Sequence, residues 1–298
     1  MKSLFRSIAA CPACRGPLDW GDDGLLCRTD GCARKFRIEG GVPILDRGED
    51  FGSIGPSAAA ADSRSPVRRM LARLLSPGAT TYKAKAGRDR QQRFVASLGE
   101  RAIALNVGSG TDDYGPRVVN LDIGPFRNVD VVGRSEWLPV QSGAVDAVIT
   151  TGVLEHVGDL GATLREVDRV LRPGGEIFHE IPFIQGFHGS HDYRRFTWQG
   201  IRQLALPGYE LLDEGVALGP SSALVWLLGE WLGMLLSFGS LRVYHRMRPL
   251  AAKLISPLRF FDAFLETHPA AQLTACSLYV HARKPGGNRA GESRALTE

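Results

Sequence analysis

Short apolar runs alternate with a helical pattern through the middle of this 298-residue chain. The runs at 102–107, 117–122, 129–132, 144–150 and 175–181 are almost continuously apolar, which is typical of strands covered on both faces. Between the last two runs, Leu160, Leu164 and Val167 recur at helical spacing, and a Pro-Gly-Gly sequence at 173–175 ends the helix. Because a strand, a helix and a strand imply a right-handed parallel crossover, the pattern predicts an α/β doubly wound sheet.

Glycines follow directly after the first apolar run, where a doubly wound sheet binds its ligand. In LNVGSG (105–110), Gly108 and Gly110 allow a ligand to approach the backbone without a Cβ clash. Asp122 ends the next run, where its carboxylate can accept hydrogen bonds from both ribose hydroxyls of a nucleotide-like ligand. A structural turn with a solvent-facing Asp stays open as an alternative. A nicotinamide-binding turn is a poorer one, because Asp113 stands where its third glycine is needed.

Several segments, taken in order and at their spacing, resemble the class I S-adenosylmethionine-dependent methyltransferases, and within them the type 11 branch. They are LNVGSGT, NLDI, VDVVGRSEWLPV, AVDAVITTGVLEHV and LREVDRVLRPGGEIFHEIP, and the likeness spans residues 102–206. The resemblance implies a Rossmann-like seven-stranded methyltransferase sheet with an antiparallel last strand, S-adenosyl-L-methionine as cofactor, and methyl transfer as the reaction. Residues 209–218 and 273–284 suit the last two strands.

The resemblance also implies where the cofactor binds. The glycine loop would hold the amino-acid moiety, Asp122 the ribose and Ile123 the adenine, with Arg134 and Ser135 beside the adenine. The implied cofactor-binding residues are Gly108, Ser109, Gly110, Asp122, Ile123, Arg134 and Ser135.

Three features depart from the family pattern. Arg134 stands where the family often has an acidic residue, and Asn106 where many members carry Asp. Only residues 111–121 separate Gly110 from Asp122, so the first crossover helix is expected to be very short or missing.

A loop at 182–200, PFIQGFHGSHDYRRFTWQG, follows the fifth apolar run and concentrates titratable side chains. If the methyl acceptor is a hydroxyl, a general base helps, and a His beside an Asp can serve as base and orienting group. The expected catalytic residues are His191, Asp192 and His188, whereas Glu155 and His156 are interpreted as structural. A capped surface loop is the alternative. HDYRRFT resembles methyltransferases of glycan and cell-envelope chemistry, which implies a small or lipid-linked acceptor such as a sugar hydroxyl.

Four cysteines lie near the start of the chain in a C-x2-C-x12-C-x4-C pattern. Two thiolate pairs on two turns can close a tetrahedral, structural Zn2+ site, and disulfides or free thiols are the alternatives. CPAC followed by RG resembles a zinc-ribbon knuckle. The expected metal ligands are Cys11, Cys14, Cys27 and Cys32.

These segments predict a zinc ribbon at 1–47, a linker at 48–66, a methyltransferase domain at 67–284 with an apolar helical insertion at 219–270, and a disordered tail at 285–298. The chain start lacks a long apolar core, which favours the cytoplasm. The 21-residue apolar stretch at 221–241 carries Glu230 at its centre, which argues against a membrane span.

Five basic and no acidic residues at 242–259 fit peripheral contact of 221–259 with the inner face of a membrane, and a buried helix pair or a dimer face is the alternative.

Nine Lys or Arg at 64–93 keep a nucleic-acid methyltransferase as an alternative function, but aromatic residues for base stacking are scarce there, so nucleic acid is disfavoured. A cofactor-binding scaffold or regulatory protein is the other alternative, and a homo-oligomer is compatible with the sequence.

Overall fold

The computed structural model describes residues 3–21, 24–47, 90–189 and 191–286. Three segments named above lie outside the described residues: the expected linker at 48–66, most of the basic segment at 64–93, and the tail from 287 onward.

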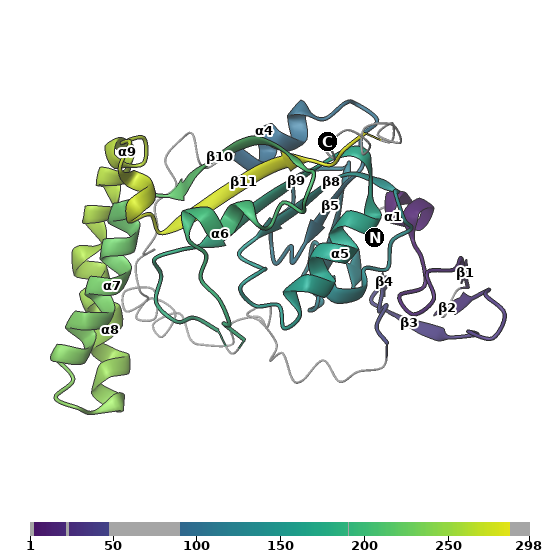
Figure 1. Ribbon diagram of the computed structural model, residues 1–298. Coiled ribbons are helices and arrows are strands. Elements are labelled where there is room, and N and C mark those ends of the chain that lie inside the picture. Colours follow the sequence, from purple (N-terminus) through teal and green to yellow (C-terminus); the bar gives the residue numbers. More distant parts are fainter. Residues whose placement is uncertain (1–2, 22–23, 48–89, 190, 287–298) are drawn as a thin grey trace, which may run out of the picture.

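A seven-stranded sheet forms the centre of the described chain (Figure 1), in the order β10-β11-β9-β8-β5-β6-β7. β5 through β9 are parallel to one another, and β11 is antiparallel to both of its neighbours. The expected seven-stranded sheet with an antiparallel last strand is therefore confirmed. The strands are β5 (Ala104–Val107), β6 (Val118–Asp122), β7 (Val131–Val132), β8 (Val145–Thr151), β9 (Leu171–Pro182), β10 (Glu210–Leu218) and β11 (Ser277–Arg283).

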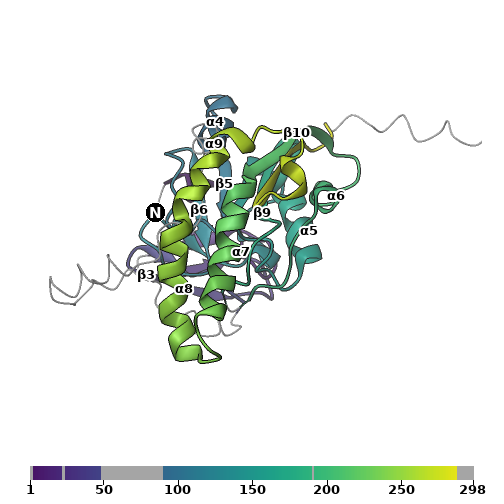
Figure 2. The ribbon, with the colours of Figure 1, turned by 90° about the vertical axis from the view of Figure 1, so that its left-hand side faces the viewer.

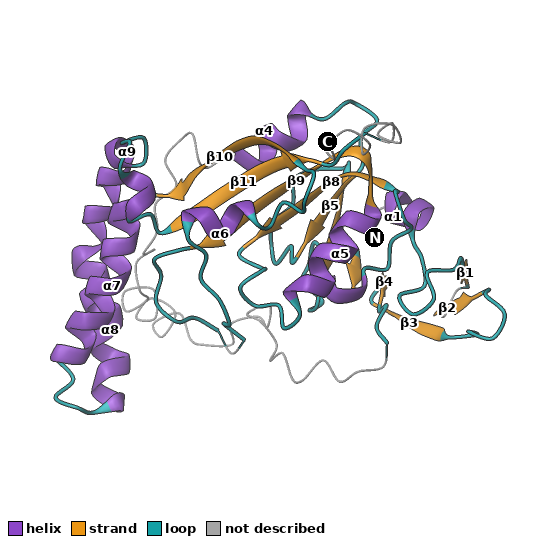
Figure 3. Cartoon of the chain, viewed as in Figure 1, coloured by secondary structure: helices purple, strands orange, loops and turns teal. Residues whose placement is uncertain are grey.

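Helices cover both faces of this sheet (Figure 3). On one face, Leu164 of α5 (Leu160–Val170) and Ile201 of α6 (Trp198–Arg202) join a buried cluster with Ile181 and Leu278. On the other face, α4 (Arg90–Ser97) buries Phe94 in a cluster with strand side chains. Asp159 is the N-cap of α5, and its carboxylate accepts a hydrogen bond of 2.8 Å from the Ala162 N–H.

The connection from β5 to β6 contains no helix. Residues 108–117 form turns instead, as the short spacing between Gly110 and Asp122 predicts. β5 has β6 on one side and β8 on the other, so strand order reverses at β5. The carboxyl end of β5 is thus the place where this class of sheet binds a ligand.

The N-terminal module, residues 3–47 where described, has its own four-stranded antiparallel sheet in the order β1-β2-β3-β4. The elements are α1 (Ser3–Ile8), β1 (Leu18–Trp20), β2 (Gly24–Cys27), β3 (Lys35–Glu39) and β4 (Val42–Pro43). In Figure 1 this module lies at one end of the molecule.

The N-terminal module packs directly on the large sheet. The Leu45 N–H donates to the Val132 carbonyl at 2.8 Å, and the Ala10 N–H donates to the Pro139 carbonyl at 3.0 Å. Phe5 and Leu45, both fully buried, share one apolar cluster with strand residues that include Leu105. The two parts of the protein are therefore held together by a common core.

A helical hairpin separates β10 from β11 and stands at the other end of the molecule (Figures 1 and 2). Gly229 and Gly233 bring its two long helices close, because a Cβ on them would lie 3.2 Å from Ala252 Cβ and 2.8 Å from Arg248 Cβ. Glu230, at the centre of the apolar stretch, is partly exposed and paired, since Arg248 Nε lies 2.6 Å from its Oε1. The elements are α7 (Pro220–Leu235), α8 (Leu241–Ile255), η2 (Ser256–Phe261), α9 (Asp262–Leu265) and η3 (Ala271–Leu273).

Among the described residues, no helix combines the length and the apolar character needed to cross a membrane.

Candidate active site

The glycine turn follows β5 directly. Gly108 has a φ of +68° and Gly110 a φ of +51°, both in the left-handed region that favours glycine. A Cβ on Gly108 would lie 2.3 Å from Val153 Cγ2, whereas nothing lies within 4 Å of the Cβ position of Gly110. The backbone at Gly110 is therefore open to a ligand. The buried Ser109 hydroxyl has no hydrogen-bond partner among the described residues, so it is available to one.

Asp122, at the end of β6, closes this turn. Its Oδ2 accepts a hydrogen bond of 2.8 Å from the Gly110 N–H, and its Oδ1 accepts one of 2.9 Å from the Gly124 N–H. The residue is only 6% exposed, and burial raises its pKa despite these bonds. Each carboxylate oxygen keeps a second lone pair, so the group can also accept from two ligand hydroxyls.

The other residues implied for adenine lie on the same edge of the sheet. Ile123 directly follows Asp122 and is 43% exposed, as a residue that packs on a ligand ring would be. Arg134 lies over the Trp137 ring at 5.5 Å, and its buried Nε has no hydrogen-bond partner among the described residues. The Ser135 hydroxyl is engaged within the protein, 3.1 Å from the Thr163 hydroxyl.

The loop after β9, within the segment 182–200, is called the acceptor loop below. It is held on the turn that follows β8. Its Tyr193 N–H donates to the Glu155 carbonyl at 2.9 Å, and Arg194 Nη2 donates to the Gly158 carbonyl at 2.8 Å. The loop thus joins the carboxyl ends of two neighbouring strands.

Two of the three expected catalytic residues meet in this loop. His188 Nδ1 lies 3.5 Å from Asp192 Oδ2, and the Arg195 guanidinium binds both carboxylate oxygens of Asp192. The Arg195 hydrogen bonds hold the pKa of Asp192 well below its usual range, so Asp192 is a weak base. His191 is exposed, and its ring lies 6.2 Å from the Tyr193 ring. Its carbonyl oxygen accepts a hydrogen bond of 2.9 Å from His156 Nδ1.

Glu155 and His156 belong to this cluster, which the structural interpretation of LEHV did not anticipate. Glu155 Oε1 lies 3.8 Å from Nε2 of both His156 and His188. Burial raises the pKa of Glu155, and its Oε2 has no hydrogen-bond partner among the described residues. The adjacent EH pair was visible in the sequence, but His188 lies 33 positions beyond Glu155, and only the fold brings it there.

The helical hairpin contacts this cluster through α7. The Trp226 ring lies 5.6 Å from the His188 ring, and a Cβ on Gly186 would lie 2.5 Å from Trp226 Nε1. The hairpin therefore forms a wall beside the acceptor loop.

The four expected metal-ligating cysteines converge in the N-terminal module. Their Sγ atoms all lie within 4.8 Å of one another, with Cys11 and Cys32 3.8 Å apart and Cys14 and Cys27 3.4 Å apart. A tetrahedral site with Zn–S bonds of about 2.3 Å needs sulfurs about 3.8 Å apart, so the donor set fits zinc. The Thr29 hydroxyl, followed by the Gly16 N–H, lowers the pKa of Cys14 to about 6, which favours a thiolate ligand.

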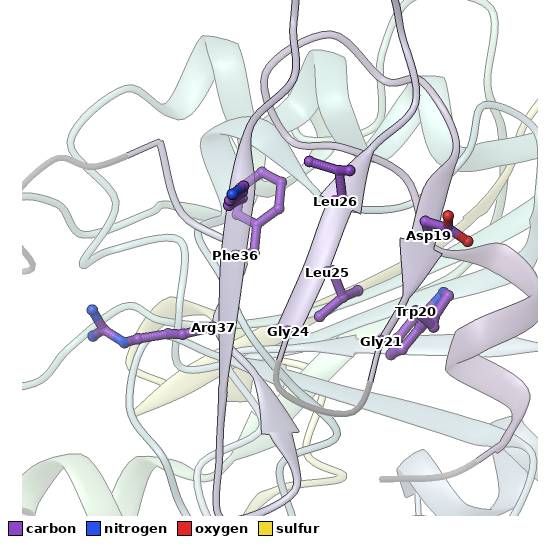
Figure 4. Close-up of a pocket in the computed structure, with 9 residues that line it drawn as sticks. Asp19, Trp20, Gly21, Gly24, Leu25, Leu26, Phe36 and Arg37 are labelled. Atoms are coloured by element: carbon purple, nitrogen blue, oxygen red, sulfur yellow. The ribbon is translucent and has the colours of Figure 1, made fainter.

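A hollow of about 630 Å³ lies on the N-terminal sheet (Figure 4). Trp20, Leu25 and Phe36 contribute to its lining, together with Asp19 and Arg37 at its border. None of its lining residues belongs to the glycine turn or the acceptor loop.

Comparison with known proteins identifies the family. The family described as Methyltransferase domain matches residues 87–179. The thiol S-methyltransferase TMT1A of Homo sapiens is 34% identical over 189 residues, which are 56% of this chain and 71% of that protein. The chain is a class I S-adenosylmethionine-dependent methyltransferase.

Two further relatives are similar over shorter stretches. The sarcosine/dimethylglycine N-methyltransferase of Halorhodospira halochloris is 33% identical over 124 residues, 40% of this methyltransferase and 44% of that one. The methyltransferase thus spans less than half the length of this relative. A UPF0434 protein of Stutzerimonas stutzeri is 38% identical over 47 residues, 15% of the methyltransferase chain and 74% of that protein.

The edge of the methyltransferase sheet fits S-adenosylmethionine. It presents an open backbone at Gly110, a buried carboxylate with spare lone pairs at Asp122, and an unpartnered hydroxyl at Ser109. These are the groups that a ligand with a ribose and an amino-acid moiety needs.

Proposed function

We propose that this methyltransferase acts on a hydroxyl of a small or lipid-linked acceptor, such as a sugar in glycan or cell-envelope biosynthesis. The observation that carries the proposal is the joining of the acceptor loop to the end of β8 through the Tyr193–Glu155 hydrogen bond. This bond brings an imidazole-rich loop to the same edge of the sheet as Gly110 and Asp122.

On the cofactor side, Gly108, Ser109 and Gly110 would hold the amino-acid moiety, and Asp122 the ribose. Ile123 would pack on the adenine, and the buried Arg134 Nε could donate to a ring nitrogen, which would replace the acidic contact common in the family. When bound, S-adenosylmethionine supplies a methyl group already activated on a sulfonium. The protein then has to orient the acceptor, exclude water and remove the acceptor proton.

On the acceptor side, His191 is the group proposed to take the hydroxyl proton. Its imidazole is exposed, and its backbone is anchored through the hydrogen bond to His156. Asp192 is a positioning residue, because its carboxylate is bound by Arg195 and by the His188 N–H at 2.7 Å. His188 would face the acceptor from the same loop.

The N-terminal module is proposed to be a zinc ribbon. The convergence of the four sulfurs supports structural zinc. Because all four ligands come from the protein, such a site has no open position for catalysis.

The helical hairpin is proposed to touch the surface of a membrane. Phe238, in the turn between α7 and α8, is 93% exposed, Leu241 at the start of α8 is 73% exposed, and Arg242 and Arg246 follow on the same hairpin. An apolar tip with basic neighbours suits a surface with anionic head groups. A lipid-linked acceptor would then reach a site whose wall is the same hairpin.

Turnover with defined acceptors tests the proposed function. The purified chain is mixed with S-adenosylmethionine and, separately, a lipid-linked sugar, a free sugar, a small thiol and an amine, and released S-adenosylhomocysteine is measured. We expect release with a hydroxyl acceptor, and none with His191→Ala although the cofactor still binds that variant.

Two results would contradict the proposal. Turnover with the thiol alone would favour the activity named for TMT1A, and cofactor binding without turnover on any acceptor would favour a scaffold.

A further inference from the structure

We propose that Glu155, His156 and His188 bind a divalent transition-metal cation of the zinc type, at a second metal site separate from the cysteines. The three potential ligand atoms all lie within 4.8 Å of one another, and Glu155 Oε1 is 3.8 Å from each Nε2. This site goes beyond the proposed function and does not depend on it.

The hydrogen bond of His156 defines which ring nitrogen is free. Its Nδ1 lies 2.9 Å from the carbonyl oxygen of His191, and a carbonyl oxygen can only accept. Nδ1 therefore carries the proton, and a neutral ring presents the lone pair of Nε2 toward Glu155. A histidine that donates through one nitrogen to a backbone carbonyl and offers the other is the usual metal-ligand arrangement.

His188 is oriented in the same way. Its Nδ1 lies 3.2 Å from the Gly186 carbonyl oxygen and 3.5 Å from Asp192 Oδ2. Arg195 Nη2 is also 3.3 Å away, but both of its protons are used, toward Gly186 O at 2.7 Å and Asp192 Oδ2 at 2.6 Å. Nδ1 of His188 is thus the donor, and its Nε2 presents a lone pair to Glu155.

Two lone pairs and a buried carboxylate converge, and no Lys or Arg of the described residues forms an ion pair with Glu155. Glu155 is 1% exposed, and its Oε2 has no hydrogen-bond partner in the described part of the chain. Direct hydrogen bonds from protonated imidazoles would need about 2.7–2.9 Å, well below the observed 3.8 Å. A cation between the three atoms removes the repulsion and satisfies the orphaned carboxylate.

The surroundings hold both rings in place. Gly189 has a φ of +80°, and a Cβ there would lie 3.4 Å from His156 Cε1, so the loop backbone packs on this ring. The His188 ring lies against Trp226. Two imidazoles and one carboxylate suit a borderline cation better than Mg2+ or Ca2+, which prefer oxygen ligands. Three protein ligands leave a position for water or for an acceptor oxygen.

Cobalt uptake tests the site with Co2+ alone as the probe. The full chain is stripped of metal under reducing conditions and titrated with Co2+, and thiolate-to-cobalt charge-transfer absorption reports the cysteine site separately. We expect His188→Gln and Glu155→Gln to bind one equivalent fewer than the parent chain, with unchanged charge-transfer absorption. His245→Gln, an exposed histidine on α8, is the matched control and should bind as much cobalt as the parent.

Equal uptake by the parent and a folded His188→Gln variant would overturn the proposal and leave a histidine–carboxylate cluster. Circular dichroism checks the fold of each variant, and His188 is the safer position because its side chain is partly exposed. Calorimetry with S-adenosylmethionine runs in parallel. If the parent chain fails to bind S-adenosylmethionine but takes up the expected cobalt, only the proposed function is contradicted. If the parent chain binds S-adenosylmethionine but takes up no more cobalt than His188→Gln, only the metal site is contradicted.

Discussion

Asp122 accepts a hydrogen bond of 2.8 Å from the Gly110 N–H, which ties the end of β6 to the turn after β5. The second carboxylate oxygen is bonded to the Gly124 N–H, so one side chain orders two loops. The same carboxylate is proposed to hold the ribose, which makes cofactor binding depend on a group that is already fixed in place. Such preorganisation lowers the entropy lost on binding.

Replacement of this carboxylate should weaken cofactor binding. Asp122→Asn keeps the shape but has one acceptor oxygen for two backbone N–H groups, and it removes charged hydrogen bonds to the ribose. We expect a loss of at least about 2 kcal/mol, or roughly 30-fold in affinity. Calorimetry with S-adenosylmethionine measures it, and Asp30→Asn in the N-terminal module is the control. Equal affinities would remove Asp122 from the ribose site.

Cofactor affinity should also depend on pH. Burial raises the pKa of Asp122 in the free protein, whereas hydroxyl donors favour the charged form and lower the pKa in the complex. Binding therefore releases a proton on the acid side, so affinity rises with pH up to the raised pKa and is constant above it. A titration of the dissociation constant against pH shows this, and the dependence should be absent in Asp122→Asn.

The Arg195–Asp192 pair should contribute strongly to stability. The Asp192 side chain is 1% exposed, and Arg195→Ala would leave its carboxylate buried without its guanidinium, held only through His188. We expect a loss of roughly 3 kcal/mol in the free energy of unfolding. Arg202→Ala, which breaks a pair between a half-exposed guanidinium and Glu214, is the control and should cost clearly less. Urea unfolding compares the two, and equal losses would argue against a buried pair.

Removal of zinc should destabilise the whole chain. Phe5 and Leu45 of the N-terminal module share a core with Leu105 of the large sheet, so unfolding around the cysteines exposes that common core. We expect a chelator, or Cys14→Ser, to lower the melting temperature of a single transition, and added zinc to restore it after chelation. Two separate transitions, of which only one responds to the chelator, would show that the core is not shared.

The hairpin tip should govern binding to vesicles. Phe238 is 93% exposed and the neighbouring Leu241 is 73% exposed, so Phe238→Ser with Leu241→Ser removes two apolar side chains available to lipid at this tip. Because burial of each is worth about 1.5–3 kcal/mol, we expect at least about a tenfold loss of binding to vesicles with anionic lipid. Flotation measures it, and Leu26→Ser, in the N-terminal module, is the control. Parent protein that does not bind such vesicles would contradict membrane contact.

Local sequence patterns were sufficient to predict the sheet and the glycine turn. Apolar runs bounded by turn residues encode strands, and both Gly108 and Gly110 proved to have positive φ. Cys11 to Cys32 lie close in sequence, so their spacing alone suggested convergence. His188 and Glu155 meet only because the successive strands β8 and β9 pair in parallel, so that the segments after them reach the same edge of the sheet, and local sequence periodicity does not predict that contact. The docking of Leu45 on β7 uses backbone hydrogen bonds, which any residue type can make.

That docking has a consequence for handling the protein. β7 is the outermost strand of the large sheet, and the segment around Ile44 and Leu45 lies along its free side. A truncated form that starts after residue 47 would present an uncovered strand edge and a bare apolar patch to other molecules. Self-association in such a fragment would then reflect a missing cover, and it would say nothing about the assembly state of the full chain.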